Sequence, residues 1–227
     1  MTSSKSADIF LIAGGSQSKN NKAILAEVLE STKKKSPHVA YIGTASDDNK
    51  DFFLMLRPII MAAGAGSVTL VPMVRRFDLD KAKDILLASD VIFISGGDVD
   101  MGMEYLRKRN LIPFLKMLYD RGELFCGISA GAIMLSLNWM HWRDPDDDDT
   151  AELLDCLGFA PLLCDVHAEV DNWVEMKRLL GFFPQGTVGY GIPAEGALRV
   201  APDGKITSIG SAPVRFIKNG ADIIENW

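Results

Sequence analysis

Cysteine and histidine are scarce in this chain of 227 residues, which has three of each. The cysteines are Cys126, Cys156 and Cys164, and no two of them form a C-x-x-C pair. An odd number of cysteines without framework spacing indicates reduced thiols rather than structural disulfides. The sequence therefore predicts a cytoplasmic protein.

Long apolar runs and basic clusters are also missing. No apolar run approaches the roughly 18 residues needed to span a bilayer, and the first one, Ile9 to Ala13, is too short for the core of a signal peptide. The formal net charge is −6, and the one basic run, Lys33 to Lys35, is short and lies at a predicted helix end. We therefore expect neither a membrane nor a nucleic-acid partner; a homodimer is left open.

The composition that remains is that of a globular protein, with 48% hydrophobic and 24% charged residues. The length suits one large domain, taken here as residues 1–227. Apolar runs alternate with stretches of helical spacing through the first 135 residues, and the runs are continuous rather than alternating. This pattern predicts a doubly wound α/β sandwich of three layers with a mostly parallel central sheet. The expected strands are 8–13, 39–42, 67–71, 91–94 and a fifth at the start of the stretch 123–135, and the expected helices are 20–35, 51–63, 79–88 and 101–119, the last divided at Asn110.

The pattern changes after about residue 138. A polar loop is expected over Trp139 to Thr150, which contains the acidic run Asp144 to Asp149. A solvated loop is the favoured interpretation of that run, because it lacks the glycine and terminal glutamate of a calcium loop. Beyond it we expect a strand at 162–166, a helix at 170–180 and short strands at 187–192, 197–201, 205–209 and 214–217. These strands are interpreted as the far, antiparallel edge of the same sheet.

The most informative stretch is Gly127-Ile128-Ser129-Ala130-Gly131, which lies where an apolar strand turns into an Ala/Leu-rich helix. G-x-S-x-G at a strand–turn–helix boundary is the pattern of a nucleophile elbow. Small residues flank the turn because strand and helix backbones approach closely there. Ser129 is then expected at the tip in a strained conformation. The alternative is a tight turn in which Ser129 merely caps the helix.

A nucleophilic serine needs a base, and the three histidines limit the search. His167 follows the apolar run 162–166, which puts it at the carboxyl end of a strand, on the same rim as Ser129. His141 lies in the predicted polar loop and is the weaker candidate, while His38 is expected to be structural. Four acids could orient the base, and the residues alone do not choose among them: Asp165, Glu169, Asp171 and Glu195.

Acyl transfer also needs donors for an oxyanion. The backbone N–H of Ala130 adjoins the nucleophile, and the pair Gly96-Gly97 follows a neighbouring strand and can approach closely. Taken alone, Gly96-Gly97 would be an ordinary turn between strand and helix; next to the elbow, the oxyanion role is favoured.

Several of these segments together resemble peptidase family S51, which includes aspartyl dipeptidase (dipeptidase E) and cyanophycinase. They are Ile94-Ser95-Gly96-Gly97-Asp98, Gly127-Ile128-Ser129-Ala130-Gly131-Ala132, His167 and Gly191-Ile192-Pro193-Ala194-Glu195-Gly196. The resemblance implies a fold like that of class I glutamine amidotransferases, which is flavodoxin-like, and a Ser-His-Glu triad without metal or cofactor. It implies Ser129 as nucleophile, His167 as base, Glu195 as its partner, and Gly97 and Ala130 as the oxyanion hole. Gly96 and Asp98 would then contact substrate.

The implied activity is hydrolysis of short peptides of the dipeptidase or exopeptidase type, through an acyl-enzyme. The chain departs from family members that take aspartyl substrates, because the segment after His167 offers only Lys177 and Arg178 as basic residues. Its rim instead carries Asp98, Asp100 and Glu175, which favour a free α-amino group or a basic side chain over an acidic one. Two alternatives remain: a non-catalytic or regulatory binding module of the same fold, and an amidase or acyl hydrolase that does not act on peptides.

Overall fold

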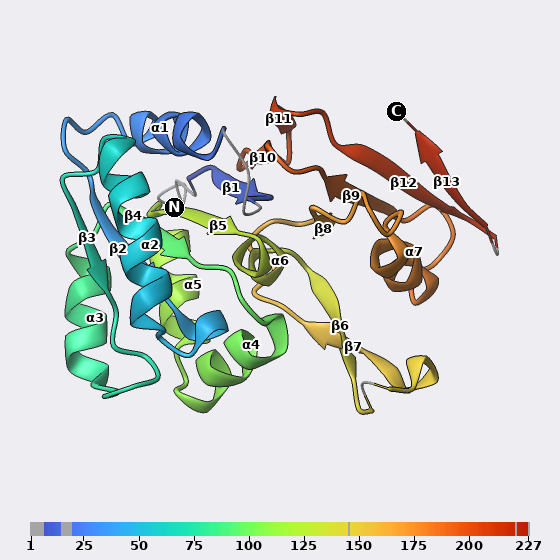
Figure 1. The fold of residues 1–227 in the computed structure, drawn as a ribbon, viewed down its shortest axis with the longest axis horizontal. Helices are drawn as coiled ribbons and strands as arrows, with labels where there is room; N and C mark the ends of the chain where they lie inside the picture. The colour runs from blue at the N-terminus through green and yellow to red at the C-terminus, as the bar shows by residue number, and fades with distance from the viewer. Residues whose placement is uncertain (1–6, 15–19, 145, 221, 227) are drawn as a thin grey trace, which may run out of the picture.

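The computed structural model describes residues 7–14, 20–144, 146–220 and 222–226. Seven strands form the central sheet in the order β11-β10-β1-β5-β4-β2-β3 (Figure 1). The five strands from β1 to β3 in that order are parallel, while β10 and β11 are antiparallel additions next to β1. The bounds are β1 Ile9–Ile12, β2 His38–Ile42, β3 Ser67–Leu70, β4 Val91–Ile94, β5 Leu124–Ile128, β10 Gly196–Val200 and β11 Ile206–Gly210.

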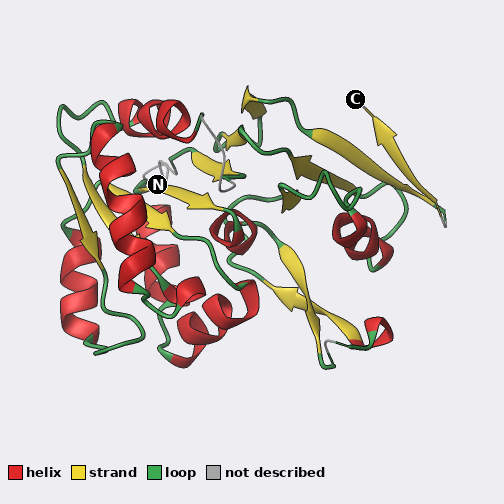
Figure 2. Cartoon of the chain, in the orientation of Figure 1, coloured by secondary structure: helices red, strands yellow, loops and turns green. Residues whose placement is uncertain are grey.

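Helices cover both faces of this sheet, which confirms the predicted three-layer sandwich (Figure 2). Successive strand residues alternate between the layers: Phe10 and Ile12 pack toward one core, and Ile9 and Leu11 toward the other. Two helices, α1 (Asn21–Ser31) and α2 (Lys50–Ala62), cover the first face. The second is covered by α3 (Leu79–Leu87), α4 (Val99–Lys108), α5 (Ile112–Asp120) and α6 (Ala130–Leu135). Both faces are therefore apolar, as the continuous runs predict.

Side chains of the expected types begin several of these helices. Asn49 accepts hydrogen bonds from two N–H groups of α2, and Asp78 and Asp98 cap α3 and α4 in the same way. Asn110 adopts a left-handed conformation with a φ of 50° between α4 and α5, and Pro113 occupies the first turn of α5. The predicted division of the 101–119 segment is therefore confirmed.

The region beyond residue 138 differs from the prediction. Only β10 and β11 extend the central sheet, whereas β8 (Leu163–Val166), β9 (Val188–Ile192), β12 (Val214–Asn219) and β13 (Asp222–Asn226) form a separate sheet in the order β13-β12-β9-β8. Helix α7 (Val174–Gly181) packs on this second sheet and starts four residues later than expected. The mistake has a physical cause: short antiparallel strands look alike in sequence whichever sheet they join.

The predicted polar loop at Trp139 to Thr150 is also wrong in part. Its beginning is strand β6 (Asn138–Trp142), which pairs with β7 (Ala151–Asp155) in a two-stranded hairpin that projects from the molecule in Figure 1. The acidic run lies at the turn of this hairpin and includes a short 3₁₀ turn, Asp148–Thr150. The charged residues at the turn suggested a loop for the whole segment, although the aromatic residues beside them are typical of a strand.

Three further features complete the described structure. A 3₁₀ turn, η1 (Thr44–Ser46), follows β2. The sequence Gly14-Gly15-Ser16 predicts a turn after the first strand; Gly14 and Gly43 follow the carboxyl ends of β1 and β2, while Gly15 and Ser16 fall outside the described residues. None of the helices in the described ranges is both long and apolar enough to cross a membrane.

Candidate active site

Ser129 lies between β5 and α6 with a φ of 53° and a ψ of −123°, a strained conformation for any residue other than glycine. The predicted strain at this serine is therefore confirmed. The turn is tight enough that a Cβ on Gly127 would lie 2.2 Å from the carbonyl oxygen of Gly131. Likewise, a Cβ on Gly131 would lie 2.1 Å from the carbonyl oxygen of Ile94 in β4. The two glycines thus let α6 start directly over the sheet and present Ser129 at the rim.

His167 meets this serine from the second sheet. Its Nε2 lies 2.9 Å from Ser129 Oγ, a hydrogen-bonding distance that suits proton transfer. The residue follows β8 with a left-handed φ of 45°, and its backbone N–H donates to the carbonyl oxygen of Ile192. The carboxyl end of β8 therefore meets that of β5, and the two ends bring serine and imidazole together.

The loop after β4 adjoins the elbow. A Cβ on Gly96 would lie 3.1 Å from Ser129 Cβ, and Gly96 itself is buried. Gly97 has a φ of 138°, and a side chain there would lie 1.9 Å from the carbonyl oxygen of Ala45, so the position accepts only glycine. Within the described residues, the backbone N–H groups of Gly97 and Ala130 donate no hydrogen bond. Both remain available to an oxyanion.

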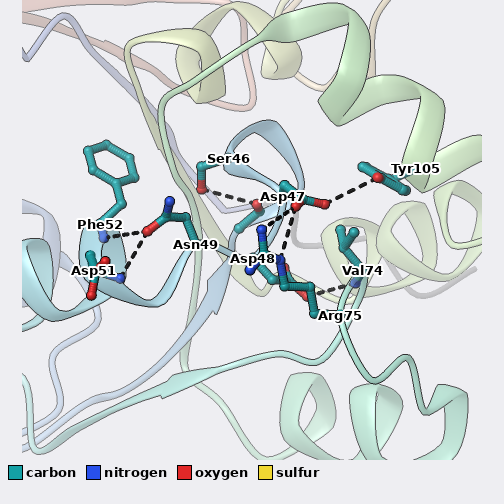
Figure 3. Close-up of polar contacts among 10 residues, drawn as sticks. Ser46, Asp47, Asp48, Asn49, Asp51, Phe52, Val74, Arg75 and Tyr105 are labelled. Atoms are coloured by element: carbon teal, nitrogen blue, oxygen red, sulfur yellow. Dashed lines mark hydrogen bonds and ion pairs between the residues drawn. The ribbon is translucent and has the colours of Figure 1, made fainter.

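The turn η1 supports the loop Gly96-Gly97. The backbone N–H of Asp98 donates to Ala45 over 2.7 Å, which fixes the glycine loop against η1. The residue after η1, Asp47, accepts two hydrogen bonds from the Arg75 guanidinium and one from the hydroxyl of Tyr105 in α4 (Figure 3). The next residue, Asp48, is buried and accepts from the backbone N–H groups of Met73 and Val74. The loop Gly96-Gly97 therefore rests on a polar frame that is tied to two separate segments, residues 73–75 and α4.

Glu195 lies in the turn between β9 and β10 with a left-handed φ of 66°. Its carbonyl oxygen accepts from the N–H of Ser211, and a Cβ on Gly210 would lie 2.2 Å from that oxygen. The turn begins just after Ile192, whose carbonyl oxygen accepts a hydrogen bond from the backbone N–H of His167. Glu195 therefore lies on the same rim as the histidine. Nearby, Glu169 accepts a hydrogen bond from the N–H of Ala194, which holds this turn in place.

The other histidines have different partners. His141, on β6, places Nδ1 2.9 Å from Oδ2 of Asp100 in α4. His38 starts β2, and its Nδ1 lies 2.9 Å from Ser67 Oγ at the opposite end of the strands, as expected for a structural residue. Of the three histidines, His167 is therefore the one that lies against Ser129, as its place after the apolar run 162–166 predicts.

A pocket of about 550 Å³ opens over Ser129. Gly97, Ala130 and His167 line it beside Ser129, and Asp98, which caps α4, lines it as well. Neither Gly96 nor Glu195 is among its lining residues. The wall includes residues that were not predicted as site residues: Val99, Ile133, Trp139, Met140, Trp142 and Val166. The tryptophans and Met140 lay in a supposed loop, and Val166 in a supposed strand core. The closely spaced tryptophans of β6 were the signal that could have found the hairpin wall.

Charge in the pocket is one-sided. Four carboxylates line it, from Asp98, Asp100, Asp165 and Glu175, and among the residues that the structure describes no lysine or arginine does. Burial, followed by the negative charge of Glu175, raises the pKa of Asp165 to about 7. Burial and Asp171 likewise raise the pKa of Glu175, partly offset by Arg178. Burial is thus the main reason that these two carboxylates are held in the proton-binding direction, and their mutual repulsion adds to it.

Other reactive groups play no part at this rim. Burial raises the pKa of Cys126 far above its ordinary value, so the thiol stays neutral within β5, as expected for a core residue. Across the described residues, no group of three or more histidine, cysteine, aspartate or glutamate side chains is placed to hold a metal ion. The chemistry that the arrangement itself supports is attack by a serine aided by an imidazole.

The fold and this rim are those of α/β hydrolytic enzymes whose serine nucleophile lies on a strand–helix turn. Residues 9–208 match the model of peptidase family S51, so the chain belongs to that family and is a serine-type peptidase. Among curated proteins, none matches the chain.

Solved structures show the same architecture. A peptidase from an acI-B1 Actinobacterium has a TM-score of 0.74 and 19% identity, with 97% of this chain and 93% of that chain covered. A putative peptidase E from Listeria monocytogenes EGD-e has a TM-score of 0.69 and 17% identity, with 91% of this chain and 99% of that one covered. At these identities the comparison establishes the fold, and it agrees with the expected flavodoxin-like sandwich.

Proposed function

We propose that this peptidase cleaves short peptides as an exopeptidase of the dipeptidase type, through an acyl-enzyme on Ser129. The observation that carries the proposal is the 2.9 Å contact between Ser129 Oγ and His167 Nε2 at the mouth of a pocket. A pocket of about 550 Å³ has the size of a small-ligand site rather than of a groove for an extended chain. It suits a substrate of one or two residues beside the scissile bond.

In the proposed reaction, Ser129 Oγ attacks the peptide carbonyl carbon while its proton passes to His167 Nε2. The carbonyl oxygen becomes an oxyanion that accepts from the N–H groups of Gly97 and Ala130. The C–N bond then breaks, His167 returns the proton to the departing amine, and an ester to Ser129 remains. A water molecule, deprotonated by His167, hydrolyses that ester and releases the carboxylate product. Glu195 is assigned to orient His167 and to stabilise its charged form.

Labelling and turnover of the full chain test this proposal. A fluorophosphonate probe is expected to attach to Ser129, and mass spectrometry of the digested protein would locate it. Ser129→Ala is expected to lose the label and to lower kcat on a dipeptide by about 10⁴-fold or more, because the covalent step is gone. Cys126→Ala is the matched control, since that neighbouring thiol is buried and should not affect labelling. Equal labelling of Ser129→Ala, or turnover of long peptides only, would refute the proposal.

A further inference from the structure

The turn η1 is followed by two consecutive residues with left-handed backbones, Asp47 with a φ of 55° and Asp48 with a φ of 48°. Residues with a Cβ rarely adopt this conformation, because the Cβ then crowds the following carbonyl oxygen. Two in succession persist only where the surrounding contacts hold them. The shape of η1 therefore depends on what these two side chains bind.

Asp48 makes the buried contact. The residue is only 3% exposed, and its Oδ2 accepts hydrogen bonds from the N–H groups of Met73, over 2.9 Å, and Val74, over 2.6 Å. A Cβ on Gly43 would lie 3.1 Å from Oδ1, so the carboxylate also packs against the residue that follows β2. The N–H groups of Ser46 and Asp48 both donate to the carbonyl oxygen of Gly43, which closes the turn. The carboxylate thus joins η1 to the segment that follows β3 (Figure 3).

Asp47 is the weaker of the two anchors. Its carboxylate accepts from Arg75 and Tyr105, but the side chains of Asp47 and Arg75 are 37% and 65% exposed. Exposed ion pairs are screened by water and contribute little to holding a backbone in place. The buried carboxylate of Asp48 is therefore the main support of the turn.

The turn transmits this support to the loop Gly96-Gly97 through Ala45. The carbonyl oxygen of Ala45 accepts from the N–H of Asp98 over 2.7 Å. A Cβ on Gly97 would lie 1.9 Å from the same oxygen, so the loop and the turn are in direct contact. Because the loop has no room to move toward η1 and is bonded to it, a displaced η1 would also displace the N–H of Gly97.

We propose that Asp48 is a positioning residue for catalysis: its buried carboxylate fixes η1, and through Ala45 it keeps the Gly97 N–H directed at the oxyanion. The inference rests on the proposed function, which assigns that N–H to the oxyanion. The oxyanion forms only after substrate has bound, so loosening the loop should lower kcat and leave KM unchanged.

The same role predicts which substitution is tolerated. Asparagine has the shape of aspartate, tolerates a left-handed backbone, and keeps a carbonyl oxygen that can accept from Met73 and Val74. Burial raises the pKa of Asp48 more than its backbone hydrogen bonds lower it, so the surroundings accept a neutral group. Asp48→Asn should therefore retain the wild-type kcat.

Steady-state kinetics of the full chain on Ala-Ala test this role. Asp48→Ala is expected to lower kcat by about tenfold to 100-fold at constant KM, a loss no larger than the one caused by removing an oxyanion donor outright. Asp48→Gly repeats the test in case Asp48→Ala fails to fold, because glycine accepts a φ of 48° without strain.

Asn49→Ala is the matched control. Asn49 is the next residue and also accepts from two backbone N–H groups, those of Asp51 and Phe52 in α2 (Figure 3). Its replacement removes a comparable pair of hydrogen bonds that lead away from the loop Gly96-Gly97. Both kcat and KM should therefore stay at their wild-type values.

Hydrogen exchange measured by NMR gives a second readout that needs no turnover. The Asp98 N–H, which is bonded to Ala45, is expected to exchange at least about tenfold faster in Asp48→Ala than in wild type, relative to the amides of β5. Loss of hydrogen bonds to a charged group causes a change of this size. Asp48→Asn and Asn49→Ala should leave the exchange unchanged.

Three outcomes would overturn the role. One is wild-type kcat and wild-type exchange in Asp48→Ala, and another is a rise in KM at constant kcat, which would make Asp48 a determinant of substrate binding. The third is equal impairment of Asp48→Asn and Asp48→Ala, which would show that charge is required rather than hydrogen bonding. An unlabelled, inactive wild-type protein whose Asp98 exchange still depends on Asp48 would refute the proposed reaction while confirming the link between Asp48 and the loop.

Discussion

The two sides of the pocket are built in different ways. The side formed by β4, β5 and α6 consists mainly of backbone: glycines without room for a Cβ, a serine in a left-handed conformation, and two N–H groups with no partner in the described structure. The opposite side, formed by β6, β8 and α7, consists of side chains, with tryptophans and carboxylates over a buried core. The first side is strained in its backbone dihedral angles, and the second holds a buried carboxylate, Asp165, whose pKa burial raises to about 7.

We therefore expect the elbow side to determine the reaction and the opposite wall to determine which substrates bind. Backbone geometry at the elbow acts on any peptide carbonyl, whatever side chains flank it. The opposite wall can change its side chains without disturbing the turn that carries Ser129. Changes on the elbow side should therefore abolish the reaction, whereas changes on the wall should alter which molecules enter, with one exception.

That exception is His167, which belongs to the wall and yet contacts Ser129. His167→Ala is expected to lower kcat by about 10⁶-fold, close to the loss from removing the whole triad, because its members act as a unit. His141→Ala, on the same wall but paired with Asp100, serves as the control and should retain turnover. Steady-state rates on a dipeptide measure both. An inactive His141→Ala protein beside an active His167→Ala protein would show that the base was wrongly assigned.

A smaller loss is expected at the turn between β9 and β10. Glu195→Gln should lower kcat by about 10⁴-fold with little change in KM, since a neutral amide would favour the wrong imidazole tautomer. Glu169→Gln is the matched control, because Glu169 holds the backbone of the same turn through Ala194. A loss in the Glu169 variant equal to that in the Glu195 variant would mean that the turn, and not the carboxylate of Glu195, matters.

The smallest expected effect concerns stability rather than rate. The raised pKa of Asp165 means that the folded protein binds a proton which the unfolded chain releases near pH 4. Stability contributed by the protonated carboxyl is therefore lost as the pH rises from about 4 through about 7. Asp165→Asn removes this loss, so its free energy of unfolding relative to wild type should increase by a few kcal/mol over that range.

Urea denaturation of both proteins at pH 5 and pH 8 measures this difference. Asp84→Asn serves as the matched control for the same change in net charge at an exposed position. If the Asp165→Asn difference from wild type does not depend on pH more than that of the control, burial of Asp165 has no electrostatic cost, and the contrast between the two sides of the pocket fails.

The elbow side was predictable from sequence because its determinants are local. The spacing Gly127-x-Ser129-x-Gly131 at a strand–helix boundary fixes which residue stands at the tip and which must be small. The parallel order of the strands then puts Gly97 on the same rim. His167 could be placed there because an apolar run leads directly into it.

The wall was harder to predict because its determinants are tertiary. Nothing in the spacing of the later short strands tells whether a strand joins the central sheet or a second one, so β8, β9 and β12 were assigned to the wrong sheet. The hairpin was hidden by the aspartates at its turn. Asp165 was considered only as a partner for His167, because its burial and its unpaired oxygen are visible only once α7 packs over β8.

The hydrogen bond between Ser129 and His167 joins two sheets that share no strand. It links them across the face where β8 lies along α6, with Cys164 Sγ 3.8 Å from the carbonyl oxygen of Ala132. A relative shift of roughly 1 Å would carry the serine and imidazole beyond hydrogen-bonding reach. In the proposed reaction, proton transfer therefore depends on the alignment of the two sheets, and on warming we expect activity to fall at a lower temperature than that at which either sheet unfolds.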